Sequence, residues 1–481
     1  MAFPTVTYNN ITGSASAASG AGPATALTGT SASFTGQVVT LDGDLDLSGV
    51  NDDGSHVLYL ATDSGIKFFK IEAKNDTGTA DTDTVTVVGT VEGTATGLTW
   101  AIGGKRNSPW DATDLAFLAS GGGILPGWTA DIEETGTAYE TTGSVGITFN
   151  TVGNLTDGPT KLTSSSSTRP EIKYNGSGGS TFVISTSNGS HIEISNLKIT
   201  QSRSAATGTV TCITTNMSTN NINFVIRNCE FVIDITGGAF LSFNRNPNDL
   251  LVCGNHFNGV GSAGTPNGVV FNNSNGNDPV HGSIISDNFF DGCGIGVSGG
   301  RSPNITIDNN IFDECIDPIK LSSGGRCEAW RITGNTIYNP TNDGVDVGAS
   351  NNQYGLILRN NIIYAGAGAG FGYSVHTLAD HPFVFSDGNS YYGHSSGVSP
   401  AGTPLVLGAR DITTDPGMAN PGNNDFTLGS SANAKAAGTP GSFPGLTGNE
   451  NFRDIGAIQR EESPSGVPQI IRPSIINTYA G

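Results

Sequence analysis

A six-residue motif, usually with asparagine at its fourth position, recurs along the chain, and its spacing restricts the fold more than any other feature. The motif reads aliphatic, two mostly polar residues, the fourth position, any residue, then apolar. Its fourth positions are Leu197, Cys229, Asn255, Asn288, Asn310, Asn335 and Asn361, at spacings of 32, 26, 33, 22, 25 and 26 residues, with a looser copy at Asn389. A coil of about 22 residues holds three short strands and three turns, and longer coils carry insertions at a turn. The repeat predicts a parallel β-helix over roughly residues 190–395.

Stacked coils would place equivalent residues above one another at the separation of neighbouring strands, about 4.8 Å. We therefore expect a structural asparagine ladder along the axis, consisting of Asn255, Asn288, Asn310, Asn335 and Asn361. Asparagine suits a bend because it tolerates the left-handed backbone conformation and bonds its own backbone. A second strand follows several motifs and supplies another wall of the core, as in Gly294–Val297, Pro318–Leu321 and Gly344–Val347.

The composition favours strands over helices throughout the 481 residues, because it combines 68 Gly with many Thr, Ser and Asn and only 13% charged residues. The predicted fold class is all-β: a right-handed single-stranded parallel β-helix with a small N-terminal β-barrel or sandwich domain and an extended C-terminal arm. The expected domains are an N-terminal arm at 1–30, the small β domain at 31–106, the β-helix with its closing segment at 107–460, and the C-terminal arm at 461–481. Residues Trp110–Leu118 fit either a short helix that caps the solenoid or an irregular linker.

The charge balance excludes two classes of partner. Forty-two acidic residues against 22 basic ones give a net charge of −20, which repels nucleic acid and anionic membrane surfaces. There is no apolar run near 20 residues, and the N-terminus has neither a Lys or Arg before Lys67 nor the apolar segment of a usual Sec signal. We expect a protein that stays in the compartment where it is made.

Two carboxylates are the candidate catalytic residues. Asp291 and Asp313 each follow a ladder asparagine by three residues, so they should lie on adjacent coils, about 5 Å apart, where they could act as nucleophile and acid of a retaining glycosidase. The alternative is that both are turn residues. Nearby acidic residues could bind Ca²⁺ through oxygen, but no metal or cofactor is expected; they are Glu314, Asp317, Asp343 and Asp346. No metal-ligand spacing is found among His256, His281, His376 and His381.

The six cysteines do not resemble a disulfide scaffold. Cys293 and Cys315 follow two ladder asparagines by five residues and should stack, and a disulfide bond between them is the alternative to free thiols. Free core thiols are the favoured interpretation, because a chain without an export signal stays in a reducing compartment.

The C-terminal tail contains Pro464, Pro468 and Pro473, so it cannot form a continuous helix. Its apolar residues need a partner surface, and we expect an extended arm that packs on a neighbouring subunit; the alternative is a disordered tail. The expected subunit contacts are Ile470, Ile471, Ile475, Ile476 and Tyr479.

The coil motifs resemble those of right-handed β-helix proteins of the pectate-lyase-like superfamily, whose coils carry an I-x-x-N-x-F type of repeat. Residues Asp415–Gly438 with Asp454–Gln459 look like the closing segment of many such proteins. The resemblance implies the fold and leaves the activity open, since the superfamily includes lyases, glycoside hydrolases, phage tailspikes and inert structural proteins. Its lyases use carboxylate-bound Ca²⁺ with a basic residue, and neither Arg301 nor Arg331 lies in such a motif.

Roughly residues 1–130, with phrases such as VVTLDGDLDLSG and GLTWAIGGKR, look like a module at the front of β-helix proteins from tailed-phage genomes. That resemblance implies a virion protein assembled in the host cytoplasm. The leading hypothesis is a non-enzymatic homotrimeric spike, tail fibre or capsid decoration protein that contacts other virion proteins through the N-terminal domain. The rival is a phage depolymerase that binds and cleaves host surface glycan through Asp291 and Asp313. A secreted adhesin is a third class.

Overall fold

The computed structural model describes residues 6–11, 27–50, 52, 57–62, 65–87, 91, 96–103, 128–132, 134, 136–141, 147–149, 159–175, 182–186, 191–202, 210–215, 221–234, 237–243, 247–259, 265–272, 282–300, 302–321, 328–347, 355–365, 373–375, 384–394, 407–439, 454–458, 460–462 and 468–470. The chain divides into two compact units, each described by itself. Unit 1 comprises Met1–Thr141, Ile147–Ile172 and His191–Leu197, and unit 2 comprises Thr142–Gly146, Lys173–Ser190 and Lys198–Gly481.

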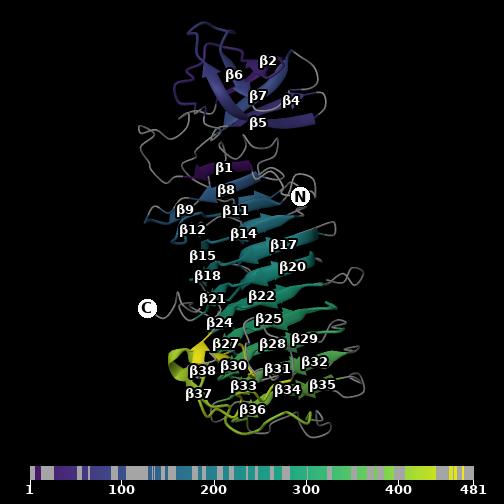
Figure 1. Ribbon diagram of the computed structural model, residues 1–481. Helices are drawn as coiled ribbons and strands as arrows, with labels where there is room; N and C mark the ends of the chain where they lie inside the picture. The colour runs from purple at the N-terminus through teal and green to yellow at the C-terminus, as the bar shows by residue number, and fades with distance from the viewer. Residues whose placement is uncertain are drawn as a thin grey trace. The chain divides into compact units, whose positions relative to one another are not determined.

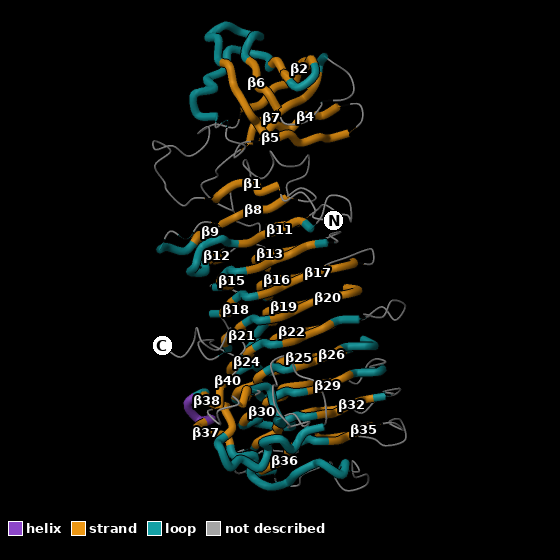
Figure 2. Tube along the Cα trace, in the orientation of Figure 1, coloured by secondary structure: helices purple, strands orange, loops and turns teal. Residues whose placement is uncertain are grey.

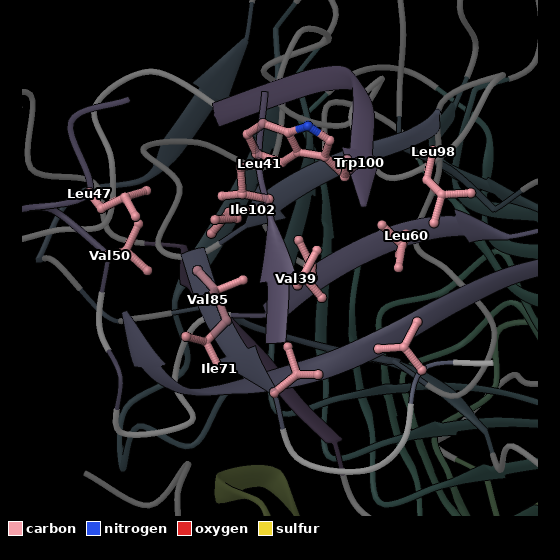
Figure 3. Packing of buried hydrophobic residues seen from close by; sticks show 14 residues of the cluster. Val39, Leu41, Leu47, Val50, Leu60, Ile71, Val85, Leu98, Trp100 and Ile102 are labelled. Carbon is pink, nitrogen blue, oxygen red and sulfur yellow. The ribbon is translucent and has the colours of Figure 1, made fainter. Parts of the chain in front are cut away.

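Unit 1 contains a closed antiparallel barrel, which resolves the choice between barrel and sandwich. Its strands, in barrel order, are β2 (Leu27–Thr35), β3 (Val38–Thr40), β6 (Thr84–Val87), β5 (Gly65–Asn75), β4 (Val57–Thr62) and β7 (Leu98–Gly103). Alternate apolar residues point inward, as strand geometry requires, and Trp100, Leu60 and Val39 are fully buried (Figure 3). The barrel begins at Leu27, inside the segment expected to be an arm.

Unit 1 also contains a parallel ladder of strands β1 (Val6–Ile11), β8 (Trp128–Ile132), β11 (Thr160–Thr163) and β14 (Ile192–Ser195). The N-terminal strand β1 pairs with β8, with Val6 opposite Trp128. Strands β9 (Tyr139–Thr141) and β10 (Ile147–Phe149) belong to the same unit, while β12 (Glu171–Tyr174) has residues in both. The expected helix at Trp110–Leu118 lies outside the described residues.

Unit 2 is a parallel β-helix with three sheets, visible as the stacked coils in Figures 1 and 2. In this unit the first sheet contains β17 (Asn221–Arg227), β20 (Pro247–Cys253), β23 (Ile284–Ser286), β26 (Thr306–Asp308), β29 (Arg331–Thr333), β32 (Leu356–Arg359) and β35 (Val384–Asp387). The second contains β15 (Lys198–Gln201), β18 (Glu230–Ile233), β21 (His256–Asn258), β24 (Phe289–Asp291), β27 (Ile311–Asp313), β30 (Thr336–Tyr338), β33 (Ile362–Tyr364) and β36 (Ser390–Tyr392). The third contains β13 (Phe182–Thr186), β16 (Thr211–Thr215), β19 (Ala239–Phe243), β22 (Asn267–Phe271), β25 (Ile295–Gly299), β28 (Asp317–Leu321), β31 (Val345–Val347) and β34 (Tyr373–Val375). The predicted fold class is confirmed.

The apolar position at the end of each motif forms the central stack of the solenoid core. Phe231, Phe257, Phe290 and Phe312 lie in register on successive strands of the second sheet and are fully buried. Their neighbouring rings stack with centroids 5.1, 4.5 and 4.6 Å apart. Because alternate residues of a strand face opposite sides, the residues flanking each phenylalanine point outward.

A left-handed backbone conformation marks each bend between the first and second sheets, and it occurs one residue before the ladder position. Positive φ angles are found at Asn228, Asp287, Asn309, Asn360 and the glycines Gly254, Gly334 and Gly388. The ladder asparagines that follow are not among the residues with positive φ. The expectation that the ladder residue itself adopts this conformation was therefore wrong: the preceding residue makes the bend, and the asparagine connects coils.

The C-terminal segment folds back over the outer face of the second sheet. We call it the C-terminal cover: residues 415–439 with 454–458, including β37 (Met418–Asn420), the 3₁₀ helix η1 (Pro421–Asn423) and β38 (Asp425–Leu428). Phe426, Ala457 and Ile458 are buried with Phe289 and Ile311 of the sheet. A hydrogen bond from the Ala457 backbone N–H to Thr336 Oγ1, 2.9 Å long, also holds the cover in place.

Beyond the cover, β39 (Arg460–Glu462) pairs antiparallel with β40 (Pro468–Ile470), so the first part of the expected arm pairs within the chain. Ile470 ends β40, whereas Ile471, Ile475, Ile476 and Tyr479 lie outside the described residues, and the subunit contact stays a prediction. Among the described residues, no helix has the length and apolar character needed to cross a membrane.

Candidate functional site

The five expected ladder asparagines lie in one hydrogen-bonded row along the solenoid axis. Each Nδ2 donates to the Oδ1 of the asparagine on the next coil, and the same Oδ1 also accepts the backbone N–H of the coil before. Asn310 Oδ1, for example, accepts Asn288 Nδ2 at 2.9 Å and the Asn288 backbone N–H at 3.0 Å. Each Nδ2 also donates to a backbone carbonyl, for Asn310 that of Ile285 at 2.8 Å. All five are buried. This row satisfies polar groups at the bends, so it carries structure rather than chemistry.

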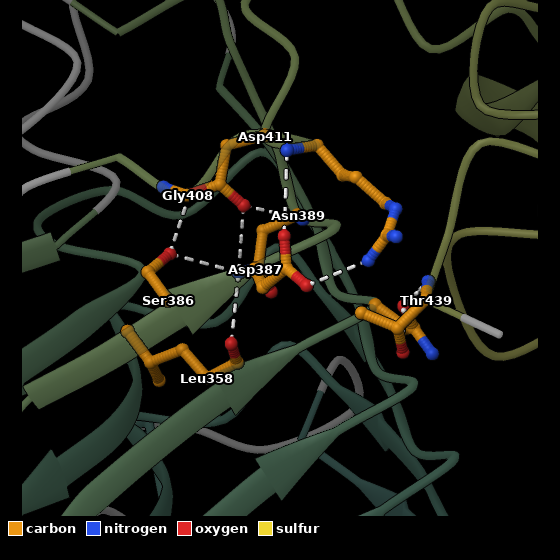
Figure 4. Close-up of polar contacts among 9 residues, drawn as sticks. Leu358, Ser386, Asp387, Asn389, Gly408, Asp411 and Thr439 are labelled. Carbon is orange, nitrogen blue, oxygen red and sulfur yellow. Dashed lines mark hydrogen bonds and ion pairs between the residues drawn. The ribbon is translucent and has the colours of Figure 1, made fainter.

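The ladder continues through Asn389 and ends on Asp411 (Figure 4). Asp411 Oδ1 accepts the Asn389 backbone N–H at 2.7 Å, and Oδ2 accepts the Ser386 hydroxyl at 2.6 Å and the Gly408 N–H at 2.7 Å. A carboxylate suits this position because every partner is a donor. The sequence motif does not reveal Asp411, although its spacing of 22 residues from Asn389 fits one coil.

The expected catalytic pair lies in register on the outer face of the second sheet. Asp291 on β24 is the direct partner of Asp313 on β27, and the same row continues with Asn258 on one side and Tyr338 on the other. Adjacent strands of a sheet are about 4.8 Å apart. The row Asn258, Asp291, Asp313 and Tyr338 is called the polar column below.

The two carboxylates have unequal surroundings. Asp313 is only 6% exposed, and within the described ranges its Oδ1 has no hydrogen-bond partner. Burial, reinforced by the negative charges of Asp291 and Glu314, raises the pKa of Asp313 to about 7. Asp291 has a side chain 19% exposed, with Oδ2 3.9 Å from Nε2 of His256. The pair therefore combines a carboxyl group that keeps its proton near neutrality with one that reaches solvent.

Two aromatic contacts position groups beside the pair. The His256 ring stacks on Phe289 with centroids 5.1 Å apart, which fixes the imidazole next to Asp291. Tyr338 meets Phe426 of the C-terminal cover edge-on at 5.8 Å. Burial, with the charges of Asp313 and Glu314, raises the pKa of Tyr338, so its hydroxyl stays protonated. Sequence spacing did not single out His256 or Tyr338 for these positions.

The other acidic candidates do not gather around the pair. Asp317 and Asp346 lie on the third sheet, where Lys320 Nζ contacts their carboxylates at 2.9 and 3.0 Å. Glu314 is exposed at the turn after Asp313, and Asn339 Nδ2 donates to its Oε1 at 3.4 Å. Asp343 is half-buried in the loop before β31. In the described portion of the chain, no group of three or more His, Cys, Asp or Glu side chains is arranged to hold a metal ion.

The stacked cysteines are buried free thiols in the core, and Cys293 and Cys315 donate to the carbonyls of Phe257 and Phe290. Burial raises the pKa of Cys293, so its thiol is unreactive. Arg331 lies on β29 of the first sheet. His281, Arg301, His376 and His381 lie outside the described residues.

Comparison with known proteins gives a partial family match and several structural likenesses. Residues 276–440, about one third of the chain, match the family described as "Disaggregatase related". No curated protein matches the chain.

The chain is similar to a mannuronic acid specific polysaccharide family 6 lyase from human gut microbiota, at 15% identity and TM-score 0.37, covering 62% of this chain and 76% of that one. It is also similar to the catalytic unit of a thermostable alpha-1,3-glucanase from Streptomyces thermodiastaticus, at 11% identity and TM-score 0.32, covering 81% and 87%. An alginate lyase is similar at 14% identity and TM-score 0.28, covering 71% and 59%. The structural neighbours of this β-helix thus include polysaccharide lyases and a glucanase.

Proposed function

We propose that the protein cleaves polysaccharide by hydrolysing a glycosidic bond at Asp291 and Asp313. One observation carries the proposal: two carboxylates in direct register differ in environment, with Asp313 buried at a pKa of about 7 and Asp291 partly exposed beside His256. Two carboxyl groups in unlike environments can divide the roles of proton donor and nucleophile between them.

The chemistry follows from that difference. Asp313, protonated near neutral pH, donates its proton to the leaving glycosidic oxygen as the carbon–oxygen bond breaks. The Asp291 carboxylate attacks the anomeric carbon, and water, deprotonated by Asp313, then cleaves the glycosyl ester. Neighbouring strands are about 4.8 Å apart, close to the roughly 5 Å separation of carboxyl groups in retaining glycosidases. The product first formed should keep its anomeric configuration.

The test is to incubate the purified chain with capsular and lipopolysaccharide glycans and to measure released reducing ends. Asp313→Asn and Asp291→Asn should each lower the rate by about 100-fold or more, since acid catalysis alone contributes 10²–10⁴-fold. Asp234→Asn, which changes an exposed aspartate directly after β18, should leave the rate unchanged. Release that persists in both catalytic variants, or no release by the parent chain across the glycans, overturns the proposal.

A non-enzymatic structural role on a tailed-phage virion is the second candidate, and one observation favours it. The N-terminal barrel has a hydrophobic core of its own, which suits an attachment module that precedes the solenoid in the sequence. Homotrimerisation and contacts to other virion proteins belong to this proposal. Sedimentation of the purified chain and antibody labelling of particles test it: a monomer that is absent from particles contradicts it. Location on a virion is compatible with the first candidate, because a virion spike can carry a glycan-cleaving site; the two candidates differ in whether the chain cleaves glycan.

A further inference from the structure

Two buried oxygen atoms of the polar column lack a hydrogen-bond partner among the described residues. Asn258 Oδ1 and Asp313 Oδ1 each have less than 1 Å² exposed and accept no hydrogen bond from the described part of the chain. They lie on either side of Asp291, which is the register partner of both residues. A buried polar atom without a hydrogen-bond partner costs about 1–3 kcal/mol, so such groups call for a bound partner.

The polar column is part of a longer register row of the second sheet. Asn258 follows Val232 in the same register row, so the polar part begins at Asn258. At the other end the half-buried Tyr338 contributes a phenolic hydroxyl and packs against Phe426, and the register row continues with Tyr364 and Tyr392. Each successive residue is one strand further along the axis, about 4.8 Å. The column is therefore a short row of amide and carboxyl groups that leads into a row of tyrosines.

We propose that the polar column binds the hydroxyl groups of a neutral glycan, with Asn258 as a binding residue beyond the cleavage point, and that it disfavours uronate polymers. This inference rests on the proposed function and names the substrate class of that site. Sugar hydroxyls, which both donate and accept hydrogen bonds, supply the partners that Asn258 Oδ1 and Asp313 Oδ1 lack. A uronate adds negative charges, and the charged neighbours that act on Asp313 are Asp291 and Glu314, both acidic. Like charges in a partly buried site repel.

Binding can be measured separately from cleavage, using the full chain with Asp313→Asn to prevent turnover. The probes are neutral polysaccharides (α-glucan, β-glucan, galactan and mannan) and uronate polymers (alginate, polygalacturonate and hyaluronan), followed by affinity electrophoresis and calorimetry. We expect at least one neutral polymer to bind and the uronates to bind about tenfold more weakly or not at all. Adding Asn258→Ala should weaken neutral binding about tenfold, the effect of one lost hydrogen bond.

Two further variants separate recognition from folding. Asn258→Asp keeps an acceptor oxygen at the position of Oδ1 and adds charge, so it should retain neutral binding while remaining folded by circular dichroism. Ser298→Ala on the outer face of the third sheet, in register with Lys320, should bind like its parent. Uronates that bind as tightly as neutral glycans, an unchanged affinity after Asn258→Ala, or no neutral binding at all would overturn the inference. Neutral binding that depends on Asn258, together with no cleavage by the native chain, would overturn the proposed function and leave this inference standing.

Discussion

Asp313 makes the stability of the folded chain depend on pH in a direction opposite to that of most carboxylates. Its pKa is raised from 3.8 to about 7, so between these values the folded chain holds a proton that the unfolded chain has lost. The contribution of Asp313 to the free energy of unfolding is therefore fully present below about pH 4. It decreases as pH rises to about 7, by up to roughly 4 kcal/mol. Asp313→Asn does not titrate and should unfold at a higher temperature than the parent at pH 8, with the difference shrinking towards pH 4. Thermal unfolding at pH 4, 6 and 8 measures this, and equal pH profiles would contradict it.

For individual residues, the sequence predicted which side chains are strand partners better than it predicted how deeply they are buried and what they contact. Counting residues from the ladder asparagines placed Asp291 opposite Asp313, because strand pairing conserves position along each coil. Counting could not show that Asp313 is buried, or that His256 lies 3.9 Å from Asp291, since both depend on packing against the outer face of the sheet. It also assigned the left-handed backbone to the ladder residue, whereas residues such as Asp287 and Asn309, one position earlier, adopt it.

The C-terminal cover supplies Phe426, the aromatic residue that packs against Tyr338 beside the carboxylate pair. Phe426 is 2% exposed, packs on Phe289 and Ile311, and meets Tyr338 edge-on. Phe426→Ala should destabilise the cover by about 3–5 kcal/mol, the usual effect of emptying a buried phenylalanine site. Limited proteolysis and hydrogen exchange across residues 415–439 should then show faster cleavage and exchange, while the coils of the first sheet stay protected.

Phe385→Ala is the matched control, because Phe385 is 47% exposed on the first sheet and its removal should leave exchange in the cover unchanged. Equal effects of the two substitutions would mean that the cover is not held by Phe426. The sequence identified residues 415–438 as a closing segment but gave no position for it. Its attachments, Thr439 to Asn360 and Ala457 to Thr336, connect residues 79 and 121 positions apart, which no local pattern encodes.

At the scale of the whole solenoid, coils should be exchangeable units, because each strand pairs only with its neighbours and the ladder connects one coil to the next. Deleting residues 289–310, the 22 residues from one ladder asparagine to the next, joins Asn288 to Ile311 and restores the motif. The shortened chain should keep its β-sheet circular dichroism and unfold cooperatively at a lowered temperature.

Deleting residues 289–299 removes an odd half-coil, which turns core residues outward, and should abolish cooperative unfolding. The full-coil deletion also removes Asp291 and keeps Asp313, so it should fold but cleave no glycan. If both deletions unfold alike, the repeat is not the unit of stability. If the folded full-coil variant still cleaves, the chemistry lies elsewhere on the solenoid.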